Sequence, residues 1–160
     1  MSTFDTESTQ LKNDLLEMAL LVRTQLEKSR EALLNYDTDL ANEIIANDKR
    51  VNVMELKIDK YCEHILALYS PVATDLRFVL ASLKINHALE RIGDHAEGIG
   101  WYVIETGKRI EQELIDRFMV VQMYEKAISM LDNIYEALEN EDTVLARKIF
   151  KKDDFLNKKN

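Results

Sequence analysis

The sequence contains few of the residues that interrupt helices, with four Gly and one Pro among its 160 residues. Gly and Pro are the two residues that most disfavour the interior of an α-helix. Aromatic residues make up only 8% of the chain, whereas 46% of it is hydrophobic and 31% is charged. This composition favours an all-α protein with enough apolar side chains for a core. The length suggests one domain or slightly more.

Cysteine and long apolar runs are also scarce. Cys62 is the only cysteine, so an internal disulfide is impossible. A free thiol in a helical pattern indicates a reducing, cytosolic setting. The first ten residues, MSTFDTESTQ, have neither the basic region nor the apolar region of a signal peptide. No apolar run approaches the roughly 20 residues that span a bilayer. We therefore expect a cytoplasmic protein that reaches membranes only through partners.

Positive charge is in the minority, because 21 Lys and Arg face 29 Asp and Glu, which gives a formal net charge of -8. Nucleic-acid binding needs a basic face that replaces the counterions of the phosphates. Docking to an anionic membrane needs a similar face. The charge balance therefore argues against both as broad activities and leaves room for a local basic patch. The sequence also has no Gly-rich phosphate loop.

The spacing of apolar residues predicts five helices. They are expected at residues 6–35, 37–69, 70–106, 111–139 and 142–160. An aspartate at 37 or 39 is expected to cap the second helix. Ser70 is expected to cap the third helix, with Pro71 as its first residue and Gly107 just past its end. Short connections predict that neighbouring helices are antiparallel.

The sequence contains an internal repeat. Residues 31–52 align without gaps to residues 136–157, and 11 of the 22 positions are identical. Such self-similarity indicates duplicated helical units that pack on each other. We expect a complete three-helix bundle in residues 1–109 and an incomplete second repeat in residues 110–160. Either the sequence is a portion of a longer protein, or another chain completes the second bundle.

Acidic residues occur where apolar residues are expected. Glu90 and Asp94 lie four residues apart in the third helix, where like charges repel across one turn. In the second helix Asp48 and Glu55 fall within the apolar stripe, and Asn52 lies at its edge. A buried carboxylate without a partner is costly, so these groups need a cation, a proton or a gap in the packing. Carboxylates on facing helices commonly hold metal ions, so these five residues form a candidate metal site.

Other interpretations of the acidic residues remain open at this point. The groups could line a solvated groove, or Arg77 and Arg91 could offset their charge by ion pairing. A carboxylate-metal enzyme is a further alternative, in which His87 is the best-placed acid or base. An oxygen-activating di-iron enzyme is disfavoured, because the sequence lacks the Glu-x-x-His pairs of that class. A plain oligomerisation module without metal is the remaining alternative.

Three sequence motifs resemble those of the PhoU family. Residues 69–99, YSPVATDLRFVLASLKINHALERIGDHAEGI, contain the family's P-x-A-x-D-L-R start and its later L-E-R-I-G-D-x-A. The DKRVN of residues 48–52 resembles the family's D-x-x-x-N in the preceding helix. The resemblance covers nearly the whole chain.

The resemblance implies an all-helical fold of repeated three-helix bundles, commonly assembled as a homodimer. It implies binding of iron or another divalent metal ion through Glu90 and Asp94, with Asp48 from the adjoining helix. It also implies a regulator and not an enzyme. Such a regulator restrains a phosphate ABC transporter, through its ATPase, and a phosphate-sensing histidine kinase when phosphate is plentiful. We therefore expect a cytoplasmic negative regulator of phosphate uptake and phosphate signalling.

Overall fold

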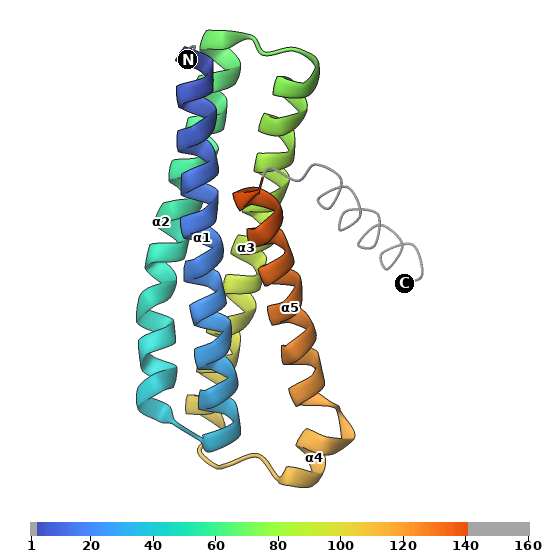
Figure 1. Ribbon diagram of the computed structural model, residues 1–160. Coiled ribbons are helices and arrows are strands. Elements are labelled where there is room, and N and C mark those ends of the chain that lie inside the picture. The colour runs from blue at the N-terminus through green and yellow to red at the C-terminus, as the bar shows by residue number, and fades with distance from the viewer. Residues whose placement is uncertain (1–2, 141–160) are drawn as a thin grey trace.

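The computed structural model describes residues 3–140, which form helices joined by short connections (Figure 1). The helices are α1 (Thr3–Asn35), α2 (Thr38–Tyr69), α3 (Ala73–Thr106), α4 (Gln112–Arg117) and α5 (Val120–Glu139). Residues 3–140 contain no β-strand, so the predicted all-α fold class is confirmed. The predicted helix at 142–160, and most of the second copy of the repeat, lie outside the described residues.

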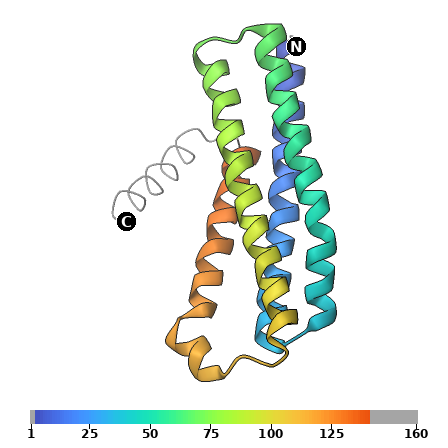
Figure 2. The ribbon, with the colours of Figure 1, turned by 180° about the vertical axis from the view of Figure 1, so that it is seen from behind.

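Helices α1, α2 and α3 form an up-and-down three-helix bundle (Figures 1 and 2). The short connections make neighbouring helices antiparallel, as predicted. Helices α2 and α3 pack together most extensively. The core between the three helices is apolar; its fully buried members include Leu15, Met18, Val22, Val51, Ile58, Ile65, Val79 and Leu89. Burial of such side chains is worth about 1.5–3 kcal/mol each and holds the bundle together.

Two of the predicted helix ends are confirmed. The carboxylate of Asp37 accepts a hydrogen bond from the backbone N–H of Leu40 at 3.0 Å, which caps the start of α2. Gly107 ends α3 in the left-handed region, with φ 64°. Glycine adopts this conformation without the steric cost that a Cβ atom would add.

The predicted start of α3 is wrong by two residues. Ser70 is not the cap of α3 but ends α2, with φ 41° and ψ 54°. Val72 occupies the position before α3, and its side chain makes no capping hydrogen bond. Pro71 explains the difference, because its ring disfavours the right-handed helical region for the residue before it. Ser70 therefore leaves the helix at this point, and Pro71 belongs to the connection.

The single helix predicted over 111–139 is divided into α4 and α5. The backbone N–H groups of Phe118 and Met119 donate to the carbonyls of Leu114 and Asp116, which closes α4. Met119 itself has φ 52° and ψ 42°, so the chain turns before α5 begins. The sequence gives no sign of this break, because methionine is neither a turn residue nor one that favours the left-handed region.

Helix α5 packs against α1. The hydroxyls of Ser29 on α1 and Tyr124 on α5 lie 3.0 Å apart and are buried. Nearer the C-terminal end of α5, Arg23 Nε donates to Asp132 Oδ1 at 2.6 Å. The predicted division between residues 109 and 110 stays a prediction, since residues 110–140 supply only α4 and α5 of the expected second repeat.

Candidate metal centre

Helices α2 and α3 bring acidic side chains together along the line where they pack, and we call this line the acidic seam. It consists of Asp48, Glu55 and Asp59 from α2 and of His87, Glu90, Asp94 and Glu97 from α3. Within each helix these residues follow one another at intervals that are mostly three or four, which places them on one face. The helices approach closely here, because α3 presents Gly93 to Val51 and Gly100 to the backbone carbonyl of Ala41.

One end of the acidic seam is formed by Asp48, Asp94 and Glu97, whose oxygen atoms lie within 4.8 Å of one another. Asp48 is only 3% exposed. Its Oδ2 accepts a weak hydrogen bond from the amide of Asn52 at 3.3 Å, whereas its Oδ1 is buried and has no donor among the described residues. Asp48 therefore presents an unsatisfied acceptor to two other carboxyls, which requires a cation or a proton.

The protonation of the seam reflects this crowding. Burial, followed by the neighbouring carboxyls of Glu97, Asp94 and Glu90, raises the pKa of Asp48 to about 7. Asp48 and Glu97 can share a hydrogen bond only when one of them is protonated. Burial and Asp94 likewise raise the pKa of Glu90 to about 7. Without a cation, the seam therefore retains protons near neutral pH.

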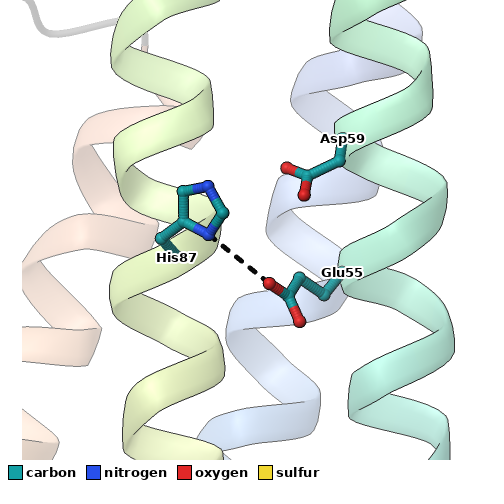
Figure 3. Close-up of side chains that lie close together, drawn as sticks. All are labelled: Glu55, Asp59 and His87. Carbon is teal, nitrogen blue, oxygen red and sulfur yellow. Dashed lines mark ion pairs between the residues drawn. The ribbon is translucent and has the colours of Figure 1, made fainter.

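The other end of the acidic seam is formed by Glu55, Asp59 and His87, whose ligand atoms also lie within 4.8 Å of one another (Figure 3). His87 Nδ1 lies 3.4 Å from Glu55 Oε1. The buried amide of Asn86 donates to Asp59 Oδ1 and to the backbone carbonyl of Glu55, each at 3.0 Å. Asn86 thus holds the Asp59 side chain in place, which is the usual role of a residue behind a metal ligand.

The structure places four of the five predicted ligands along the seam: Asp48, Glu55, Glu90 and Asp94. The fifth, Asn52, is exposed, and its amide is oriented as a donor to Asp48. The alternative in which Arg77 and Arg91 offset the acidic charge by ion pairing is not supported by the described residues. Within residues 3–140 neither side chain forms an ion pair, and both are exposed, so no cationic side chain in this part of the chain pairs with Asp48.

Reasoning from the sequence missed three residues of the seam as candidate ligands: Asp59, His87 and Glu97. Spacing could have identified two of them. Asp59 follows Glu55 by four residues, and Glu97 follows Asp94 by three, so each shares a helix face with a predicted ligand. His87 lies on the same face of α3 as Glu90, but a single exposed histidine gives no sign of its partner across the helix pair.

Cys62 is not part of the acidic seam. It is buried in the core, and burial raises the pKa of its thiol to about 12. The thiol therefore stays protonated and is a poor nucleophile or metal ligand. In the described part of the chain, no helix combines the length and apolar character that a membrane crossing requires.

The fold and the seam define an all-α helical-bundle protein with clustered carboxylates between two of its helices. The sequence matches the PhoU domain over residues 15–103 and 120–160. The chain belongs to the PhoU family, and the resemblance noted from its motifs is confirmed.

Two relatives illustrate the similarity. The chain is 34% identical over 148 residues to the "Phosphate-specific transport system accessory protein PhoU homolog" of Aquifex aeolicus, a match that covers 92% of this chain and 66% of the relative. It is 33% identical over 150 residues to the accessory protein PhoU of Escherichia coli, covering 94% of this chain and 61% of the relative. The chain thus spans about two thirds of the length of these curated relatives.

Solved structures give the same result. PhoU from Pseudomonas aeruginosa superposes with a TM-score of 0.81 at 29% identity, covering 98% of this chain and 74% of that one. The phosphate transport system regulatory protein PhoU from Streptococcus pneumoniae has a TM-score of 0.78 at 30% identity, with coverages of 98% and 72%. These structures confirm the predicted PhoU-like helical bundle.

Proposed function

We propose that this chain acts as an accessory regulator of phosphate transport and works by contacting other proteins, without catalysing a reaction. One observation carries the proposal: the similarity to phosphate-specific transport accessory proteins extends over more than nine tenths of the chain. The match to the PhoU domain over residues 15–103 contains most of the α1–α3 bundle and the carboxylates of the acidic seam on both α2 and α3.

The finer parts of the proposal come from the family resemblance. The regulator would restrain a phosphate ABC transporter, through its ATPase, and a phosphate-sensing histidine kinase when phosphate is plentiful. It would thereby act as a negative regulator of the phosphate response and would assemble as a homodimer. A cytoplasmic location belongs to the same proposal and is supported by the free, buried thiol of Cys62.

The acidic seam is proposed to hold iron or another divalent metal ion. The chemistry of the donors fits such an ion, because the seam offers carboxylate oxygens and a single imidazole nitrogen. The buried Oδ1 of Asp48, which has no hydrogen-bond donor among the described residues, supports this fit independently. The residues that would hold metal are Asp48, Asp94 and Glu97 at one end and Glu55, Asp59 and His87 at the other, with Glu90 close to both groups.

A bound ion would supply positive charge in place of the protons that Asp48 and Glu90 otherwise retain. The carboxylates of α2 and α3 would then be joined across the seam, where Gly93 already allows the two helices to approach. The expected role of the seam is structural, because it fixes the relative position of two helices whose outer faces are available to partner proteins.

The test is the output of a phosphate-responsive alkaline phosphatase in a strain that lacks this gene, grown in high phosphate. The strain is complemented with the native gene, with Glu90→Ala/Asp94→Ala, and with the control Glu105→Ala, which changes an exposed acid of α3 outside the seam. The proposal expects derepression on deletion and repression by the native gene and the control. Unchanged output on deletion would contradict the phosphate role. Repression by Glu90→Ala/Asp94→Ala would leave the phosphate role intact but would show that the acidic seam is not needed for it.

A further inference from the structure

A second surface lies between α1 and α2, away from the acidic seam. It is a shallow groove with a volume of about 330 Å³. Its apolar lining is Leu21, Val53 and Met54, and its cations are Lys49, Arg50 and Lys57. We call this surface the cationic groove. Arg50 and Lys57 follow Asp48 and Glu55 by two residues each, which is a rotation of about 200° around α2. Helix α2 therefore presents acids to α3 and cations to the opposite side.

The charge of the cationic groove is opposite to that of the chain. The formal net charge is -8, whereas the groove contains three cations and a single acid, Glu17. Lys49 and Arg50 are exposed and have no ion-pair partner within residues 3–140. Lys57 Nζ lies 3.5 Å from Asp14 Oδ1, but its side chain is 56% exposed and remains at the surface. The groove therefore attracts anions locally, although the net negative charge of the chain repels them elsewhere.

The groove also exposes apolar surface. Val53 is 66% exposed, and Leu21 and Met54 are half-buried beside it. Surfaces of this kind, between two packed antiparallel helices, accept the ridge of a third helix. A helix seated there would present apolar side chains at intervals of three and four to Val53, and its flanks would meet Lys49, Arg50 and Lys57.

We propose that the cationic groove binds an acidic amphipathic helix of a partner protein. Charge complementarity selects this occupant, since apolar contact alone would not require three cations around Val53. An anionic membrane is the less favoured occupant, because three cations on a chain of net charge -8 give little attraction to a flat lipid surface. The inference goes beyond the proposed phosphate role and does not require metal in the acidic seam.

The binding test uses the full chain and a fluorescein-labelled synthetic peptide of about five helical turns. The peptide carries leucine at intervals of three and four and glutamate at its other positions. A control peptide keeps the leucines and replaces the glutamates by lysine. Fluorescence anisotropy is expected to show saturable binding of the acidic peptide that weakens as salt is raised. The basic peptide is expected to bind at least about ten-fold more weakly.

Matched variants locate the site. Arg50→Glu and Val53→Asp change exposed side chains of the groove and are each expected to raise the dissociation constant about ten-fold. Their controls are Lys84→Glu on α3 and Leu56→Asp on α2, which make matching changes of charge at exposed positions outside the groove. The controls are expected to bind like the native chain, and circular dichroism checks that every variant is folded.

Three results would overturn the proposal. The first is no saturable binding of the acidic peptide, or binding that Arg50→Glu and Val53→Asp leave unchanged. The second is concentration-dependent self-association that Arg50→Glu abolishes, measured by sedimentation, which would make a second copy the occupant. The third is stronger binding to phosphatidylglycerol vesicles than to the peptide, with the same dependence on Arg50, which would make the groove a lipid site.

Discussion

Gly93 of α3 faces Val51 of α2 so closely that a Cβ atom at position 93 would lie 3.0 Å from Val51 Cγ1. Val51 is fully buried, so its side chain has little freedom to move aside. The same Cβ atom would lie 3.7 Å from Asp48 Oδ1. The absence of a side chain at position 93 therefore sets the distance between the two helices at the point where the acidic seam begins.

Gly93→Ala is expected to destabilise the protein by about 1–3 kcal/mol, because the added methyl overpacks the contact with Val51. This loss exceeds the gain of up to about 1 kcal/mol that alanine brings to a helix interior. Thermal unfolding followed by circular dichroism measures the effect. Gly98→Ala is the control in the same helix, because no described residue outside the adjacent helix backbone lies within 4 Å of the Cβ position there, and it is expected to be neutral or stabilising. Equal melting temperatures for the two variants would contradict the prediction.

Metal removal is expected to destabilise the native chain through the acidic seam. An ion present at about 100 times its dissociation constant stabilises the folded state by about 2.7 kcal/mol. Chelation should therefore lower the melting temperature of metal-loaded protein. Asp94→Ala should lower the metal content measured by mass spectrometry and reduce the effect of the chelator, whereas Glu105→Ala should change neither. Unchanged metal content in Asp94→Ala would contradict the assignment of metal binding to the acidic seam.

The metal-free protein is expected to lose stability as pH rises through neutrality. The pKa of Asp48 is raised from 3.8 to about 7 and that of Glu90 from 4.5 to about 7. A raised folded-state pKa gives stability that is fully present below the unfolded pKa and is lost as pH rises through the folded value. Thermal unfolding in chelator between about pH 4 and pH 8 should show this decline.

Asp48→Asn provides the control for the pH dependence, because it removes one titrating carboxyl and keeps a similar shape. The variant should show a shallower decline than the native chain. A native profile that is flat over the same range, or one that rises with pH, would mean that the buried carboxyls are satisfied in another way.

Cys62 is expected to resist thiol reagents in the folded protein. Its side chain is fully buried, and burial raises the pKa of the thiol to about 12. A disulfide reagent at mildly alkaline pH should therefore react slowly with native protein and quickly after unfolding in denaturant. Fast reaction of the native protein, at the rate of a free thiol, would show that the core at Cys62 opens readily.

The sequence predicted most of the fold because its signals are local. Periodic apolar residues located the three long helices, and Asp37 and Gly107 located two of their ends by known capping chemistry. The start of α3 was misplaced because Ser70 and Pro71 favour a helix start as well as a helix stop. The break at Met119 could not be predicted, since methionine carries no local signal for a turn or for the left-handed conformation that it adopts there.

The candidate site was predicted less completely because it spans two helices. Asp48, Glu90 and Asp94 were identifiable as acids on apolar faces. The pairing of Glu55 with His87, and of Asp48 with Glu97, depends on the register between α2 and α3. That register is fixed by the close approach at Gly93 and Gly100, which a single sequence does not reveal.

The packing of α5 has a consequence for how the molecule opens. Of the long helices in residues 3–140, α1 alone lies close to the backbone of α5, whereas α2 and α3 each pack against two long helices and α1 packs against three. Separation of α5 therefore breaks one helix interface, whereas release of α2 breaks two. The amide hydrogens of α5 should exchange with solvent through a partial opening that leaves the α1–α3 bundle closed. The chain would thus have two levels of protection against exchange, and the hydroxyl pair of Ser29 and Tyr124 lies at the boundary between them.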